Sequence, residues 1–151
     1  MKVKPVMFVI MSFCAGIFIG GFIFSQTIPR SIFVARACES NCLNKENIAA
    51  LLLSAGINVS TKFIPGVTAG SDKCIAIKHW KPKGRYHTVF FPKKDALNIM
   101  SLDVDDMECF LDCLSLAKEQ VEKAGYSHYR FVSNGPALQH LSYFHFHIIA
   151  R

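Results

Sequence analysis

The sequence has no dense run of lysine and arginine and no nucleic-acid-binding motif, although its formal net charge is +6 at pH 7. We therefore expect no nucleic-acid partner, because such proteins gather basic side chains on one face or in a recognisable motif. The basic balance instead suits an anionic partner or a membrane surface. Internal repeats and low-complexity tracts are also absent. The 151 residues leave room for one modest domain and a targeting segment.

Charged side chains are missing from residues 5–24, which form an almost wholly apolar run. A membrane-spanning helix needs roughly 20 such residues, and the run exceeds the ~7–15 residues of a secretory signal core. No clear cleavage site follows it. We therefore expect a single-pass membrane anchor or an uncleaved signal. Basic residues lie on both sides (Lys2 and Lys4, Arg30 and Arg36), and the short N-terminal tail favours a domain on the non-cytoplasmic side.

Two pairs of cysteines share the spacing C-x3-C: Cys38 with Cys42, and Cys109 with Cys113. On a helix this spacing places both sulfurs on one face. Such pairs could staple neighbouring helices in an oxidising compartment, or they could be small buried residues in a reducing cytosol. The sequence leaves both alternatives open. A zinc site built from these pairs is not expected, because zinc-finger spacings are usually tighter.

The remaining sequence predicts an α+β fold with one long helix packed on an antiparallel sheet. Short apolar stretches bounded by glycine and proline predict the strands, and one amphipathic stretch predicts the long helix. The predicted strands are 74–77, 87–91, 129–132 and 142–150, and the predicted helices are 45–54 and 103–124, the latter capped by Asp103 and ended by Gly125. The predicted organisation is a basic tail (1–4), an anchor (5–24), a juxtamembrane linker with a short helix (25–70) and a folded domain (71–151).

The last predicted strand carries two histidines at alternating positions. Alternate residues of a strand share one face, so Tyr143, His145 and His147 point one way while the intervening apolar residues point into the core. Two imidazoles held together suit either of two chemistries. One is metal binding, with His87 and Cys74 as further ligands. The other is covalent catalysis on phosphorus, in which one imidazole attacks and the other assists.

Residues 72–151 resemble the histidine triad (HIT) family, in particular its small nucleotide-binding, phosphoramidase-like branch. Four separated blocks carry the resemblance in order along the chain. They are Asp72-Lys73-Cys74-Ile75-Ala76, then His87-Thr88-Val89-Phe90-Phe91-Pro92-Lys93-Lys94, then Tyr129-Arg130-Phe131-Val132-Ser133-Asn134, and last Gln139 with His145-Phe146-His147-Ile148-Ile149.

The resemblance implies a role for each matching residue. His145 corresponds to the nucleophile, which forms a nucleotidyl-histidine intermediate, and His147 to the histidine near the phosphate and leaving group. Asn134 and Gln139 correspond to polar residues that contact the phosphate or leaving group. His87 matches an additional family histidine.

Other positions add a zinc candidate or depart from the pattern. Cys74 matches a cysteine discussed as a zinc ligand in some members, so zinc is a candidate although no cofactor is expected to be required. Tyr143 replaces the first histidine of the triad, where the backbone carbonyl orients the nucleophile. His79 replaces the acid that usually receives the ribose hydroxyls, and His140 replaces a small residue. These departures put ordinary purine nucleoside recognition in doubt.

The resemblance and the apolar run together predict a membrane-anchored HIT-like hydrolase or nucleotidyl transferase. Its target would be a phosphoramidate, phosphoanhydride or nucleotidyl bond, and its ligand a nucleotide or nucleotide-linked molecule. One alternative is a pyrophosphatase acting on a nucleotide-linked lipid such as CDP-diacylglycerol. Another is a degenerate HIT fold that binds a nucleotide or a metal without catalysis. A homodimer is a further expectation from the resemblance.

Overall fold

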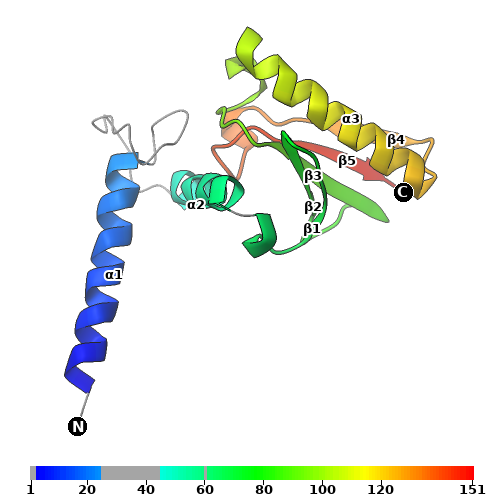
Figure 1. The fold of residues 1–151 in the computed structure, drawn as a ribbon. Coiled ribbons are helices and arrows are strands. Elements are labelled where there is room, and N and C mark those ends of the chain that lie inside the picture. The colour runs from blue at the N-terminus through cyan, green and yellow to red at the C-terminus, as the bar shows by residue number, and fades with distance from the viewer. Residues whose placement is uncertain (1–2, 25–44, 60) are drawn as a thin grey trace.

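The computed structural model describes residues 3–24, 45–59 and 61–151. Three α-helices and five strands make up the regular structure, with four short 3-10 turns between them (Figure 1). The helices are α1 (Val3–Phe24), α2 (Lys45–Val59) and α3 (Met107–Ala124), the strands are β1 (Val67–Gly70), β2 (Cys74–Lys78), β3 (Tyr86–Pro92), β4 (Tyr129–Val132) and β5 (Phe146–Ala150), and the 3-10 turns are η1 (Thr61–Phe63), η2 (Ile99–Ser101), η3 (Val104–Asp106) and η4 (Pro136–Leu138).

The strands form one antiparallel sheet in the order β1-β2-β3-β5-β4. Helix α3 lies along one face of this sheet, and α2 lies on the other side (Figure 1). The predicted α+β class with one long helix on an antiparallel sheet is therefore confirmed.

Side chains alternate between the two faces of the sheet, as the period of a strand requires. The face under α3 carries one apolar cluster, formed by Cys74, Ala76, Phe90, Ala96, Cys113, Leu116, Ala117, Val121, Phe144, Phe146 and Ile148. The opposite face carries a second cluster with residues of α2, formed by Ala50, Ile57, Ile75, Val89, Phe91 and Tyr143. This alternation directs His147 of β5 away from α3.

Helix α3 is fixed at both ends by local chemistry. Asp103 caps the preceding 3-10 turn by accepting a hydrogen bond from the Asp106 backbone N–H (3.1 Å). Gly125 ends the helix in the left-handed conformation (φ 72°), which glycine adopts without a steric penalty. The helix runs from Met107, so the predicted start at Asp103 was one turn early.

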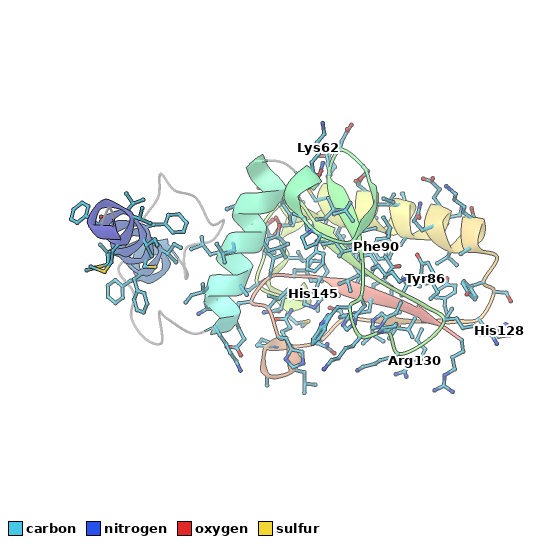
Figure 2. The ribbon with its side chains drawn as sticks, turned by 90° about the horizontal axis from the view of Figure 1, so that it is seen from below. Lys62, Tyr86, Phe90, His128, Arg130 and His145 are labelled. Carbon is cyan, nitrogen blue, oxygen red and sulfur yellow. A yellow bond between two sulfur atoms is a disulfide. The ribbon has the colours of Figure 1, made fainter. Side chains whose placement is uncertain are left out.

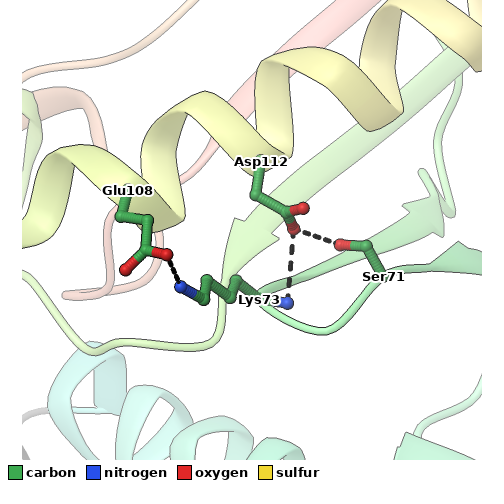
Figure 3. A network of polar contacts seen from close by, with 4 residues as sticks. All are labelled: Ser71, Lys73, Glu108 and Asp112. Atoms are coloured by element: carbon green, nitrogen blue, oxygen red, sulfur yellow. Dashed lines mark hydrogen bonds and ion pairs between the residues drawn. The ribbon is translucent and has the colours of Figure 1, made fainter.

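A disulfide and a polar network join α3 to the start of β2. Cys74 of β2 pairs with Cys113 of α3. The carboxylate of Asp112 accepts hydrogen bonds from the hydroxyl of Ser71 and from the backbone N–H of Lys73, and the Lys73 ammonium pairs with Glu108 (Figure 3). Cys113 is thus bonded to a strand and does not join two helices, while Cys109 is free. Cys38 and Cys42 lie outside the described residues.

The predicted membrane anchor and its sidedness are wrong. Residues 3–24 do form a helix, α1, but no helix over the described residues is long and apolar enough to cross a membrane. The predicted run only just reaches the roughly 20 residues that a span requires. Helix α1 also begins with the charged Lys4 in its first turn.

Three other sequence predictions also need correction. Strand β1 was placed inside the predicted linker, and α2 continues past Ser54 and Gly56 to Val59. The last strand begins at Phe146, so His145 lies directly before it. The predicted strands 74–77, 87–91 and 129–132 are confirmed to within one residue at each end. The predicted domain boundaries stay predictions.

Candidate active site

A cavity of about 1270 Å³ opens on the face of the sheet opposite α3. One wall is apolar and comes largely from α2 and the segment after it, with Ala49, Leu52, Leu53, Gly56, Ile64 and Pro65. The other wall carries His79, His87, His140, His145 and His147, together with Asn134 and Gln139. All the histidines named from the sequence as site residues therefore meet in one cavity.

The ring of His145 is held by the backbone two residues earlier. Its Nδ1 lies 2.7 Å from the carbonyl oxygen of Tyr143. A carbonyl only accepts hydrogen bonds, so Nδ1 carries the proton and Nε2 keeps its lone pair. Burial lowers the pKa of His145, and the hydrogen bond to the Tyr143 carbonyl opposes this effect only in part. At neutral pH His145 thus presents an uncharged ring with a lone pair on Nε2.

The carbonyl of Tyr143 is itself fixed through the side chain of the same residue. Tyr143 is fully buried, and its hydroxyl donates a hydrogen bond to the carbonyl oxygen of Pro92 at the end of β3 (2.7 Å). The ring packs edge-on against Phe91. The expectation that any residue here can supply the orienting carbonyl fits this geometry, and tyrosine adds an anchor of its own. Figure 2 shows His145 near α2, with His128 and Arg130 at the opposite end of the sheet.

A hydrogen-bond chain sets the protonation of His147. The backbone N–H of Lys83 donates to Nδ1 of His87 (3.1 Å), which therefore has no proton. The proton of neutral His87 then sits on Nε2, which lies 3.0 Å from Nδ1 of His147 and donates to it. The proton of His147 must therefore be on Nε2. His147 is a hydrogen-bond donor next to His145, with ring centroids 5.1 Å apart.

Both histidines of this hydrogen-bond chain, His87 and His147, are strongly biased toward the neutral form. Burial, followed by the neighbouring His79 and Lys83, lowers the pKa of His87 to about 4. Burial, followed by the neighbouring histidines and Lys83, lowers the pKa of His147 to about 3. The hydrogen-bond directions derived above therefore hold at neutral pH.

His79 extends the cluster at the mouth of the cavity. Its ring stacks on that of His87 with centroids 4.1 Å apart and an interplanar angle of 5°. Its Nδ1 accepts a hydrogen bond from the backbone N–H of Lys81 (3.0 Å), so its proton lies on Nε2. Burial lowers the pKa of His79 as well. His79 thus offers a hydrogen-bond donor at the position where the family resemblance implies an acidic residue.

The imidazoles do not suit a resident metal ion, although His79, His87 and His147 each have a ring nitrogen within 4.8 Å of the others. A metal-binding imidazole needs one bare nitrogen for the metal and donates a hydrogen bond from the other. In His79 and His87, a backbone N–H already occupies the bare nitrogen. Cys74 is bonded to Cys113. The set of zinc ligands considered from the sequence (Cys74, His87, His147) therefore does not fit zinc.

Three further polar residues line the same cavity: Asn134, Gln139 and His140. The Nε2 of Gln139 is buried and has no hydrogen-bond partner among the described residues. A buried donor without a partner costs free energy, unless a ligand or a water molecule accepts its hydrogen bond. The phosphate-binding roles of these residues remain predictions.

Several residues of the cavity were not predicted as part of the site. Lys78, Trp80, Lys81 and Lys83 line its mouth, and α2 supplies its apolar wall. The signal for the lysines was present in the sequence as a basic cluster in a turn, although solvated loop charge is the commoner explanation for such a cluster. The contribution of α2 had no comparable signal, because it depends on how the helix packs on the sheet.

The fold and the site define a class of protein: an α+β domain with a five-stranded sheet and two neighbouring imidazoles, at the start of the last strand, in a cavity. The family described as HIT domain matches residues 66–151, which is more than half of the chain, and the chain belongs to this family. The expected resemblance is thus confirmed at the level of the family.

Solved structures give the same result for the fold. A HIT family hydrolase from Clostridium thermocellum has a TM-score of 0.58 at 22% identity, and the match covers 66% of this chain and 89% of that chain. A HIT family hydrolase from Legionella pneumophila has a TM-score of 0.55 at 25% identity, and the match covers 62% of this chain and 88% of that chain. A histidine triad protein from Clostridium difficile has a TM-score of 0.57 at 19% identity, with 66% and 89% covered. No curated protein matched the sequence.

Proposed function

We propose that this protein is a HIT-family hydrolase or nucleotidyl transferase that cleaves a phosphoramidate, phosphoanhydride or nucleotidyl bond through His145. The observation that carries the proposal is the hydrogen-bond pattern of the two imidazoles. Backbone groups leave a lone pair on Nε2 of His145 and place a proton on Nε2 of His147. An attacking atom and a donor for the phosphoryl oxygen thus lie side by side.

The reaction would proceed in two displacements. The lone pair on Nε2 of His145 forms a bond to phosphorus while the bond to the leaving group breaks, and the leaving group takes its electron pair and a proton from solvent. The resulting phosphoryl-imidazolium is positive, and the Tyr143 carbonyl stabilises it through Nδ1–H. Water then attacks phosphorus, the P–N bond electrons return to Nε2, and the proton of the water leaves to solvent.

His147 would stabilise charge in this scheme and would not transfer a proton. A neutral imidazole N–H donates a hydrogen bond readily, but it does not release its proton near neutral pH. Its Nε2–H would therefore hold a phosphoryl oxygen as charge develops, together with Asn134 and the unpartnered Nε2 of Gln139. Donors of this kind each contribute roughly 3–4 kcal/mol to transition-state stability when removal is measured. Nucleotides are the proposed ligands, and the names of the HIT hydrolases above agree with the proposed activity.

A second candidate substrate class follows from the apolar wall of the cavity. Six residues of α2 and the segment after it line the cavity, and none of them has a polar side chain. A nucleotide joined to an apolar moiety, such as CDP-diacylglycerol, would place its phosphates at the histidines and its apolar part against α2. The homodimer remains a further proposal from family resemblance.

The decisive experiment combines turnover with intact-mass analysis. Purified protein is mixed with adenosine 5′-phosphoramidate or CDP-diacylglycerol, and the mass of a nucleotidyl adduct is sought on His145. We expect an adduct and turnover in the wild type and neither in His145→Ala. Turnover that survives His145→Ala contradicts the catalytic role. Nucleotide binding without adduct or turnover would identify a binding module instead.

A further inference from the structure

The mouth of the cavity is basic. Among the described residues that line the cavity, none is an aspartate or a glutamate, whereas Lys78, Lys81 and Lys83 all belong to it. The last two lysines lie in the turn between β2 and β3, beside His79 and the exposed Trp80. A phosphate bound at this mouth would meet cations and no competing carboxylate.

The turn that carries these lysines is held in one shape. The backbone N–H groups of Lys81 and Lys83 donate to the rings of His79 and His87, and the His79 backbone N–H donates to the His87 carbonyl (2.9 Å). The ammonium of Lys83 is close enough to act on all three imidazoles, since it contributes to the lowered pKa of His79, His87 and His147. The backbone that carries Lys81 and Lys83 is therefore positioned before any ligand binds.

The donors at the mouth lie next to the reaction centre but do not overlap it. The ring of His79 is 5.7 Å from that of His147, and the ring of His147 is 5.1 Å from that of His145. The proton on Nε2 of His79 adds a neutral donor to the two ammonium groups. An oxyanion at the mouth would therefore stand beside the phosphorus that His145 attacks, within the reach of one small molecule.

We propose that His79, Lys81 and Lys83 form a second anion subsite, so that the preferred substrate carries a further phosphate besides the one attacked by His145. This inference rests on the proposed function, because it takes the His145 end of the cavity as the place of the first phosphate. The ligand class is a nucleotide with two phosphates. The second phosphate is either a neighbour of the first or a substituent of the sugar.

Equilibrium binding of non-reacting nucleotides tests this subsite. Calorimetry compares AMP with the non-hydrolysable α,β-methylene analogue of ADP and with adenosine 3′,5′-bisphosphate in the wild type and in the double variant Lys81→Ala/Lys83→Ala. Lys118→Ala is the matched control, since Lys118 is an exposed lysine on α3 outside the cavity. We expect at least one two-phosphate ligand to bind about tenfold or more tightly than AMP, the effect of one charge-assisted hydrogen bond. The double variant should lose this preference, and Lys118→Ala should keep it.

The outcomes separate the subsite from the catalytic proposal. Equal affinity for all three nucleotides in the wild type, or a preference that persists in the double variant, overturns the subsite. If inorganic phosphate added to AMP reproduces the affinity gain, the subsite takes free phosphate and the substrate inference is overturned. Because no step of this measurement requires turnover, a two-phosphate preference without any His145 adduct would support the subsite and contradict only the proposed catalysis.

Discussion

At the scale of single residues, two chemically identical side chains receive opposite roles from backbone groups. The Tyr143 carbonyl places the proton of His145 on Nδ1, while the Lys83 N–H, acting through His87, places the proton of His147 on Nε2. Neither assignment depends on an ionised partner. The neutral state of both rings follows mainly from burial.

Tyr143 is the residue whose contribution can be tested most directly. In Tyr143→Phe the ring and the carbonyl remain, but the hydroxyl that bonds to Pro92 is lost. We expect the free energy of unfolding to fall by about 1–3 kcal/mol, because the buried Pro92 carbonyl loses its partner. We also expect a several-fold lower kcat with little change in KM, since the nucleophile is less well positioned. Urea unfolding and steady-state kinetics with adenosine 5′-phosphoramidate measure both quantities. An unchanged kcat would show that the hydroxyl serves stability alone.

The sequence identified residues that line one cavity, but it did not show how they interact. Alternation along residues 142–150 was sufficient to place His145 and His147 on one face, and the structure brings His79, His87 and His140 to the same cavity. The hydrogen-bond directions could not be predicted, because they depend on where the turn after β2 aims the N–H groups of Lys81 and Lys83. A period-2 pattern contains no information about that turn.

At the scale of elements, the turn between β2 and β3 connects the sheet to the site. Gly84 lies in this turn against the backbone carbonyl of Ala150 in β5, and a Cβ at Gly84 would overlap that carbonyl. Ala150 pairs with both β3 and β4, so it cannot move without disturbing two ladders. The turn can therefore adopt its shape only with glycine at this position.

Gly84→Ala should consequently affect both stability and binding. We expect the free energy of unfolding to fall by about 1–3 kcal/mol, the usual effect of overpacking, and the preference for two-phosphate nucleotides to weaken as Lys81 and Lys83 shift. Gly135→Ala is the control for stability, because no atom lies within 4 Å of a Cβ there. Thermal unfolding and calorimetry test the pair. A Gly84→Ala protein as stable as Gly135→Ala would refute the steric argument.

The elements differ in how well the sequence predicted them, for physical reasons. Helix α3 has strong end signals in Asp103 and Gly125, and its predicted end was correct. Strand β1 has only four residues, contains a register shift and follows Gly66, so its pattern is that of a loop. It is a strand because the edge of β2 offers hydrogen bonds to it, which is a tertiary effect. The Cys74–Cys113 bond likewise depends on how α3 lies on the sheet.

At the scale of the whole molecule, the sheet separates a stabilising face from a reactive face. The face under α3 holds the larger apolar cluster, the disulfide and the polar network of Asp112. The opposite face holds the smaller apolar cluster and the cavity, where His87 and His147 have pKa values far below 6.5. The packing on the face under α3 must therefore offset the free-energy cost of the cavity and of the neutral histidines on the opposite face.

That cost predicts how the stability of the whole protein changes with pH. Unfolded histidines take up protons near pH 6.5, whereas His87 and His147 resist protonation until about pH 4 and about pH 3. The unfolded chain therefore binds more protons throughout this window, and the free energy of unfolding falls as pH is lowered from about 7 to 4, by at most about 1.4 kcal/mol per pH unit for each histidine. Urea unfolding at a series of pH values measures the slope.

The variant His87→Asn isolates one histidine from the carboxylates that titrate in the same range. Asparagine supplies no proton-binding site, so the variant should lose less stability than the wild type between pH 7 and pH 4. His128→Asn, at an exposed histidine far from the cavity, controls for the loss of a histidine as such. Parallel pH profiles for the wild type and His87→Asn would mean that His87 is protonated as easily in the folded protein as in the unfolded chain. The donor chain to His147, and with it the proposed division of roles, would then have to be abandoned.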